Sequence, residues 1–184
     1  MKIANYIQTL FKDCVFILCL LVSSSGLFAS EKEIFSKKEA FAHLSSFTSQ
    51  VATPDNNKIV TMESIDELSG LKVEENKKVI VKESGLYFVI VSGRVGTEGI
   101  SLVGNIDLFL MKNGQPIPHS YTNYQSLSRI TTSNLVSHVV LPLKKGDYIS
   151  VGISSDSTNL GLIAFSTPHK KIPSLIFSMY QIQN

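Results

Sequence analysis

The sequence predicts an all-β fold in which antiparallel strands form a sandwich or a barrel. From residue 47 onward, apolar runs of five to ten residues alternate with turn clusters at short spacing, a pattern typical of such folds. Helix signals are nearly absent after residue 50, which argues against a parallel α/β fold, and no repeat of fixed period indicates a solenoid. The expected strands are 47–51, 58–62, 71–73, 78–82, 85–95, 104–112, 135–143, 148–154 and 174–182.

Composition excludes several classes of protein. The chain has 184 residues, of which 43% are apolar and 17% charged, so collagen, a coiled coil and an acidic disordered chain are excluded as the main body. The formal net charge of +2 is too small for a strong nucleic-acid or membrane-surface footprint. We therefore expect no nucleic-acid partner.

The first 29 residues have the order of a secretory signal peptide. Lys2 and Lys12 precede an apolar run at 15–22, and small residues follow it. Eight apolar residues are too few to cross a bilayer as a helix, which needs roughly 20. Cleavage after Ser24 or after Ala29 fits about equally well, and an uncleaved amphipathic helix or anchor is the alternative. We expect a secreted, periplasmic or cell-surface protein with no membrane span after the leader is removed.

Both cysteines, Cys14 and Cys19, lie inside this leader. The mature chain would have none, which excludes a disulfide framework, a cysteine-ligated metal and a cysteine nucleophile there. Lipidation of Cys19 is disfavoured because the bulky Leu18 precedes it. An exported domain without disulfides fits a bacterium better than an animal extracellular space.

A short charged segment at 30–39 leads into the domain, which we expect to span 40–184. The stretch 31–43 is the one helical candidate, with a linker followed by the first strand as the alternative.

Two strands are apolar on both faces, namely 86–91 and 175–180. A two-layer antiparallel sandwich buries only one face of each strand, so something else must cover the second face. Another copy of the chain is the economical cover, and the segment 115–134 is the alternative.

Two turns stand out. Asn113-Gly114 is the strongest short hairpin signal, because both residues accept the positive backbone angles of a two-residue turn. The stretch 144–147, Lys-Lys-Gly-Asp, indicates a second tight turn.

Four segments in this order resemble TNF-like and complement globular-head domains. They are 83–89 (Glu-Ser-Gly-Leu-Tyr-Phe-Val), 110–114 (Leu-Met-Lys-Asn-Gly), 143–149 (Leu-Lys-Lys-Gly-Asp-Tyr-Ile) and 175–179 (Leu-Ile-Phe-Ser-Met). The resemblance covers about residues 40–183. The chain departs from the bacterial stalked members in having no Gly-X-Y stretch before the domain. It departs from the complement-type pattern in having Ser178 and Met179 where an aromatic-Ser-Gly-aromatic signature is common.

The resemblance implies a jelly roll of about ten strands that assembles as a homotrimer and serves binding rather than catalysis. Alternate side chains of a strand point to opposite faces. The resemblance places Ile90 and Ile176 toward the trimer axis, so Tyr87 and Phe177 belong to the sandwich core. The expected trimer-interface residues are Phe88, Ile90, Ile176, Ser178 and Tyr180.

Motifs for catalysis or metal binding are missing from the sequence. The four histidines, His43, His119, His138 and His169, have no second histidine at metal-ligand spacing. No G-x-S-x-G elbow or glycine-rich phosphate loop occurs. We expect no catalytic residues and no resident cofactor. A Ca²⁺ site of the kind found in some TNF-like domains would have to use the scattered acids Asp107, Asp147 and Asp156.

The leading hypothesis is therefore an exported bacterial homotrimer that acts as a binding or adhesion module, with an unknown protein or glycan as its partner. The alternative is a structural coat or envelope component whose role is self-assembly. An enzyme with an unrecognised site is a third hypothesis. Glycan binding favours exposed aromatic residues in loops, and Tyr121 and Tyr124 are the candidates.

Overall fold

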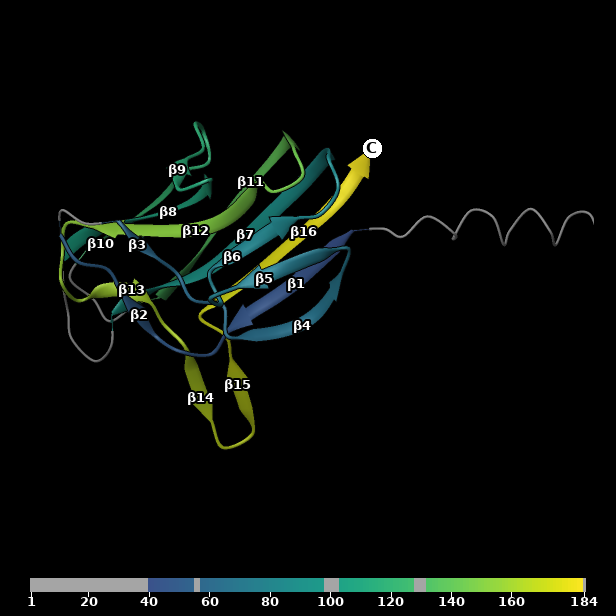
Figure 1. The fold of residues 1–184 in the computed structure, drawn as a ribbon. Helices are drawn as coiled ribbons and strands as arrows, with labels where there is room; N and C mark the ends of the chain where they lie inside the picture. Colours follow the sequence, from purple (N-terminus) through teal and green to yellow (C-terminus); the bar gives the residue numbers. More distant parts are fainter. Residues whose placement is uncertain (1–39, 55–56, 98–102, 128–131, 184) are drawn as a thin grey trace, which may run out of the picture. The chain divides into compact units, whose positions relative to one another are not determined.

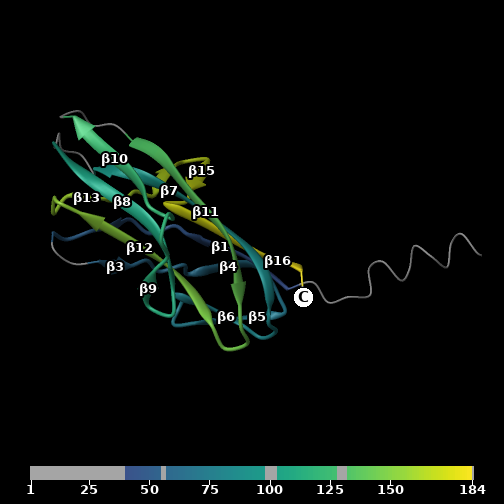
Figure 2. The same ribbon diagram turned by 90° about the horizontal axis from the view of Figure 1, so that it is seen from above.

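The computed structural model describes residues 40–54, 57–97, 103–127 and 132–183. Within these ranges the chain forms sixteen strands and no helix. Two antiparallel sheets pack face to face as a sandwich and do not close into a barrel (Figures 1 and 2). The predicted all-β sandwich is confirmed. The predicted leader, both of its cysteines and the lead-in segment lie outside the described residues.

Each of the two sheets contains seven strands. The first sheet consists of β1 (Phe41–Ser46), β2 (Gln50–Val51), β4 (Ser64–Ser69), β7 (Gly85–Thr97), β11 (Thr132–Leu143), β13 (Leu160–Leu162) and β16 (Leu175–Gln183). The second consists of β3 (Lys58–Ile59), β5 (Leu71–Glu74), β6 (Lys78–Val81), β8 (Val103–Lys112), β9 (Gln115–Pro116), β10 (Thr122–Leu127) and β12 (Tyr148–Ser155). The long strands occur where the apolar runs predicted them.

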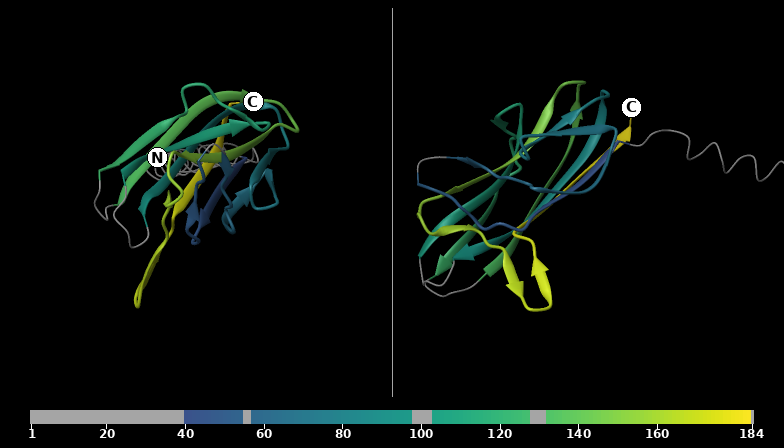
Figure 3. Two further views of the ribbon diagram at one scale, coloured as in Figure 1. Left: turned by 90° about the vertical axis from the view of Figure 1, so that its left-hand side faces the viewer. Right: turned by 60° about the horizontal axis from the view of Figure 1, so that its bottom comes forward.

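A separate hairpin of β14 (Phe165–Thr167) and β15 (Lys170–Ile172) extends away from the two sheets (Figure 3). Its Phe165 and Ile172 lie opposite each other, and both are exposed. The guanidinium of Arg94 lies 5.1 Å from the centre of the Phe165 ring.

In the first sheet, β7 is the central strand. β11 pairs with one of its edges and β16 with the other, and β1 lies on the far side of β16. The core lies between the two sheets and is built from alternate residues of these strands. Its large members include Leu44, Met62, Tyr87, Ile106, Leu108, Leu110, Ile149, Ile153 and Phe177.

The helical candidate at 31–43 is wrong for its residues 41–43, because β1 begins at Phe41, as the alternative of a first strand expected. Ala42 and Leu44 are fully buried while Phe41 and His43 are only half-buried on the opposite face. This period of two follows from the pairing of β1 with β16 and β4.

Several strands are shorter than predicted or were not predicted. The runs at 47–51 and 58–62 each contribute only two strand residues. β4 was missed because its Ser-Ile-Asp-Glu-Leu-Ser sequence is polar, as suits a strand at the edge of a sheet. β10 was missed because it is built largely of polar residues.

The two predicted turns form, and hydrogen bonds connect them. Asn113 and Gly114 have φ values of 52° and 80° and close the two-residue hairpin between β8 and β9. Gly146, with φ of 90°, lies in the turn that carries the chain from the first sheet to the second. The Asn113 side chain donates to Asp147 Oδ1 at 2.8 Å and accepts from the Tyr148 N–H at 2.9 Å.

We predict that Gly114→Val lowers the free energy of unfolding by roughly 1–3 kcal/mol, because a β-branched residue is strained at positive φ. A Cβ at this position would also lie 3.2 Å from the Tyr148 hydroxyl. Urea denaturation measures the change. Gln115→Val, which introduces the same side chain one residue later in an exposed strand position, is the control. Equal stability of the two variants would show that the turn does not set the register.

Candidate functional site

The outer face of the first sheet carries a largely apolar surface. We call this surface the apolar face. It is made of Phe41 on β1, Leu86, Phe88 and Ile90 on β7, Val136 and Val140 on β11, and Ile176 and Tyr180 on β16. Val140 is 55% exposed, Tyr180 44% and Ile176 38%. These are large apolar side chains that the described part of the chain leaves uncovered.

The predicted division of β7 and β16 between two faces is confirmed. Tyr87 and Phe177 are fully buried in the core, as expected. Their sequence neighbours Phe88 and Ile176 point to the other side of the sheet. Alternation therefore assigned each side chain to its face correctly.

Pairing of the strands arranges the apolar face in rows across the sheet. One row consists of Val140, Phe88, Tyr180 and Phe41, each opposite the next on its neighbouring strand. Directly opposed side chains in such a row contact one another. The predicted interface residues Phe88 and Tyr180 thus lie side by side although they are far apart in the sequence.

The next row is partly polar. It consists of His138, Ile90, Ser178 and His43. Nδ1 of His43 lies 2.7 Å from Oγ of Ser178, and the His138 ring lies 6.3 Å from the Phe88 ring. The hydroxyl of Ser178 therefore has a hydrogen-bond partner on the neighbouring strand. It can lie in an apolar contact without being left unpaired. Sequence reasoning missed both histidines as members of this face, because the pairing of strands is not visible in single motifs.

The alternative that the segment 115–134 covers the apolar face is wrong for its described residues. Strands β9 and β10 pair with β8 in the second sheet. Residues 132–134 begin β11 and extend the first sheet at its edge instead of crossing its outer face.

The two candidate ligand-binding tyrosines have different surroundings. Tyr121 precedes β10, is 48% exposed and stacks on Phe109 with ring centres 4.6 Å apart. Tyr124 lies within β10 and packs against the hydrophobic core, so its expected place in an exposed loop is wrong. Pairing of β10 with the apolar strand β8 turns Tyr124 inward.

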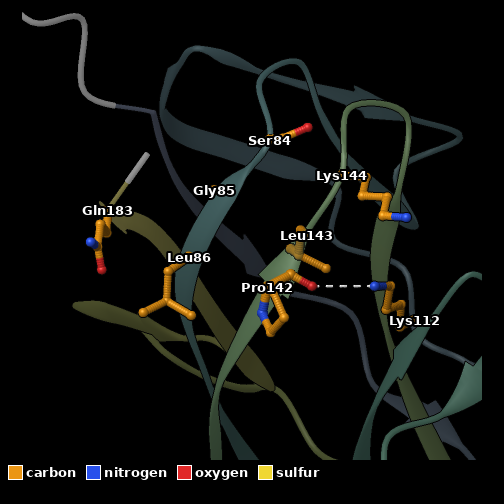
Figure 4. Close-up of a pocket in the computed structure, with 8 residues that line it drawn as sticks. All are labelled: Ser84, Gly85, Leu86, Lys112, Pro142, Leu143, Lys144 and Gln183. Carbon is orange, nitrogen blue, oxygen red and sulfur yellow. Dashed lines mark hydrogen bonds between the residues drawn. The ribbon is translucent and has the colours of Figure 1, made fainter.

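A shallow open pocket of about 530 Å³ lies beside the ends of β7, β11 and β16. Its lining is Ser84, Gly85, Leu86, Lys112, Pro142, Leu143, Lys144 and Gln183 (Figure 4). Nζ of Lys112 donates to the Pro142 carbonyl at 3.3 Å and lies 2.9 Å from Asp147 Oδ2. The lining contains two lysines, Lys112 and Lys144, and no histidine, cysteine or carboxylate side chain.

The three acids considered for Ca²⁺ do not gather into one cluster, and each has partners within the protein. Asp107 accepts from Asn123 at 2.8 Å, and Asp156 accepts from the Asn105 side chain at 2.8 Å. Asp147 accepts from Asn113 and from the backbone N–H of Lys144. Among the described residues, no three His, Cys, Asp or Glu side chains lie close enough together to hold a metal ion.

The hydrogen bonds of Asp147 make the fold sensitive to acid. Partial burial alone would raise the pKa of this carboxyl, but hydrogen bonds from Asn113, Lys144 and Lys112, with the charge of Lys112, lower the pKa to about 2. A carboxylate whose pKa is lower in the folded state stabilises the fold above its ordinary pKa, and the effect disappears as the pH falls through the folded value.

We predict that Asp147→Asn lowers the melting temperature at neutral pH. The difference from the wild type should shrink as the pH falls from about 4 to about 2, because the wild-type carboxyl is then also neutral. Thermal unfolding followed by circular dichroism across this range measures it. Asp66→Asn, on the exposed edge strand β4, controls for the loss of one carboxylate. A difference that stays constant down to pH 2 would contradict the assignment.

Comparisons with known proteins do not assign a family. No protein-family model matches the sequence, and no curated protein matches it significantly. None of the described residues forms a helix of the length and hydropathy needed to cross a bilayer.

Proposed function

We propose that this chain is an exported, homotrimeric binding or adhesion module of the TNF-like jelly-roll class, without catalytic activity. The main observation in support of the proposal is the uncovered apolar face. Isolated exposed apolar residues are ordinary, but a contiguous patch on one sheet is typical of a protein–protein contact. The trimer interface would be formed by Phe88, Ile90, Ile176, Ser178 and Tyr180.

The strand arrangement supports the jelly-roll part of the proposal. The connections from β7 to β8, from β10 to β11 and from β11 to β12 each cross from one sheet to the other. β1 and β16 pair in the middle of the first sheet. Crossing connections of this kind are what a double-sheet jelly roll requires.

Export is supported by the basic, apolar and small residues of the first 29 positions. The mature protein would then act in the periplasm, at the cell surface or in the medium, where its partner is a protein or a glycan.

The experiment that tests this proposal is sedimentation equilibrium of the exported protein at micromolar concentration. We expect three chains per particle, and amino-terminal sequencing of the same sample should begin between Ser25 and Glu31. A monomer would overturn the trimer, and an intact Met1 in the exported pool would overturn the cleaved leader.

A structural coat component is the second candidate, favoured by the β14–β15 hairpin. Its exposed Phe165 and Ile172 form an apolar pair on a segment that extends from the sandwich. If the hairpin of one chain contacts a different surface on another chain, the contacts can repeat without closing. They would then build an open array instead of a closed trimer. Particles much larger than a trimer in the same sedimentation experiment would favour this candidate.

A further inference from the structure

We propose that the outer face of the second sheet binds a neutral oligosaccharide, with the ring of Tyr121 as its stacking platform. This assignment rests on the proposed binding function and names the ligand class. It does not require the trimer, because it uses the sheet on the opposite side of the core from the apolar face.

The platform is a layered stack of Gly152, Phe109 and Tyr121. Phe109 is fully buried although it points away from the sandwich core. Gly152 lies opposite it on β12, and a side chain there would collide with the Phe109 ring. Tyr121 covers the other side of Phe109, with an angle of 21° between the two rings. Since one ring face of Tyr121 is covered, its exposed area lies mainly on the opposite face and the edge.

The backbone before Tyr121 is firmly held. The hydroxyl of Ser120, which is 2% exposed, donates to the Ile117 carbonyl at 2.8 Å and accepts from the Leu110 N–H at 3.1 Å. The Ser137 hydroxyl donates to the Ser120 carbonyl. The preceding residue, His119, has φ of 64°, a conformation that is uncommon for a residue other than glycine and that often marks functional sites. An exposed ring on such a fixed backbone loses little freedom when a ligand binds.

Beside the aromatic row lies a row of hydrogen-bonding side chains. Asp107 lies between Asn123 on β10 and Ser154 on β12. Asn123 Nδ2 donates to Asp107 Oδ1 at 2.8 Å, and Ser154 Oγ donates to Oδ2 at 3.3 Å. A carboxylate accepts about four hydrogen bonds, so Asp107 retains acceptors for ligand hydroxyls.

A second polar row follows. Gln125 lies opposite Asn105, and Asn105 bonds to Asp156. Rows two residues apart along a strand are separated by about 7 Å. The aromatic row and the two polar rows therefore form a strip long enough for a short oligosaccharide.

The chemistry of this strip fits a sugar. One face of a pyranose ring presents C–H groups, which pack on the negative face of an aromatic ring, while its hydroxyls need both donors and acceptors. Amides and carboxylates supply these. Among the described residues, neither Asp107 nor Asp156 forms an ion pair, so the strip repels anions. A neutral saccharide is therefore favoured over a uronic acid or a phosphate.

The test is isothermal titration of the exported protein with four hexasaccharides: cellohexaose, chitohexaose, maltohexaose and the anionic hexagalacturonate. We expect binding of at least one neutral probe. Tyr121→Ala should weaken that binding at least tenfold, which corresponds to about 1.4 kcal/mol. Tyr121→Phe should retain it because the ring remains. Phe165→Ala, which removes an exposed aromatic ring elsewhere, should bind as the wild type does.

A second variant keeps the test decisive if Tyr121→Ala fails to fold. Asp107→Asn preserves the side-chain shape but removes the charge and acceptor sites, so it should weaken binding of the neutral probe. Failure of every neutral probe, preference for the anionic probe, or full binding by Tyr121→Ala would overturn the proposal. If the wild type binds no saccharide and Tyr121→Ala loses adhesion to a protein ligand, Tyr121 belongs to a protein-binding surface instead.

The two proposals fail independently. Sedimentation reports the trimer, while titration reports the sugar. A monomeric Ile90→Asp chain should keep the saccharide affinity of each subunit and lose only the multivalent gain on a surface that displays many copies of the sugar.

Discussion

In the proposed trimer, Ile90→Asp is expected to convert the assembly to monomer or to aggregate. Ile90 lies on the apolar face between Phe88 and Ser92, and its side chain does not enter the core. Three copies of the new carboxylate would meet near one axis, where each loses water and repels the others. An unpaired buried charge costs several kcal/mol, so association should weaken by more than roughly a thousandfold. Sedimentation velocity at micromolar concentration measures the change.

Two further variants make this experiment specific. Ile176→Asp lies on the same face, opposite Ser45 and Ser92 and not directly opposite a histidine, and should have the same effect. Lys170→Asp, on the exposed strand β15, should leave the oligomer intact. A trimer that persists in both Ile90→Asp and Ile176→Asp would show that the apolar face is not the interface.

Phe177→Ala is expected to destabilise the fold by about 3–5 kcal/mol, through lost apolar burial and the cavity left behind. Phe177 is fully buried and lies between Leu44 and Val91 on its neighbouring strands. Since domains are usually stable by only 5–15 kcal/mol, this one change should remove a large part of the total. Urea denaturation followed by circular dichroism measures it.

The matched control is Phe165→Ala, because Phe165 is 47% exposed on the β14–β15 hairpin. Its contact with Arg94 is a surface cation–π interaction worth about 0.5–1 kcal/mol, so the loss of stability should stay near that value. Similar losses in the two variants would contradict the assignment of Phe177 to the core.

The sequence predicted those parts of the fold in which burial sets a clear local period. β7 and β16 were predicted as strands because each is a long apolar run bounded by turn residues. The turns at Gly114 and Gly146 were found because only a few residue types accept their backbone angles. In each case the signal lies within a few neighbouring residues.

The parts that were missed depend on pairing between distant residues. Tyr124 was expected in a loop, but the strand partner that turns it inward is Ile106 on β8. The stack of Tyr121 on Phe109 joins β8 to the segment before β10, and no local pattern indicates it. His43 and Ser178 are 135 residues apart, so their contact follows from topology alone.

The pairing of β1 with β16 also determines when the domain can fold. β16 lies between β7 and β1, so the middle of the first sheet is incomplete until the last strand is in place. The chain between β1 and β16 must close into a long loop before their contact can stabilise the fold. Topologies rich in such long-range pairs fold slowly. A chain that crosses a membrane amino terminus first would therefore reach the far side before its central sheet could form. β16, the last of the described strands to emerge, thus secures β1, the first of them.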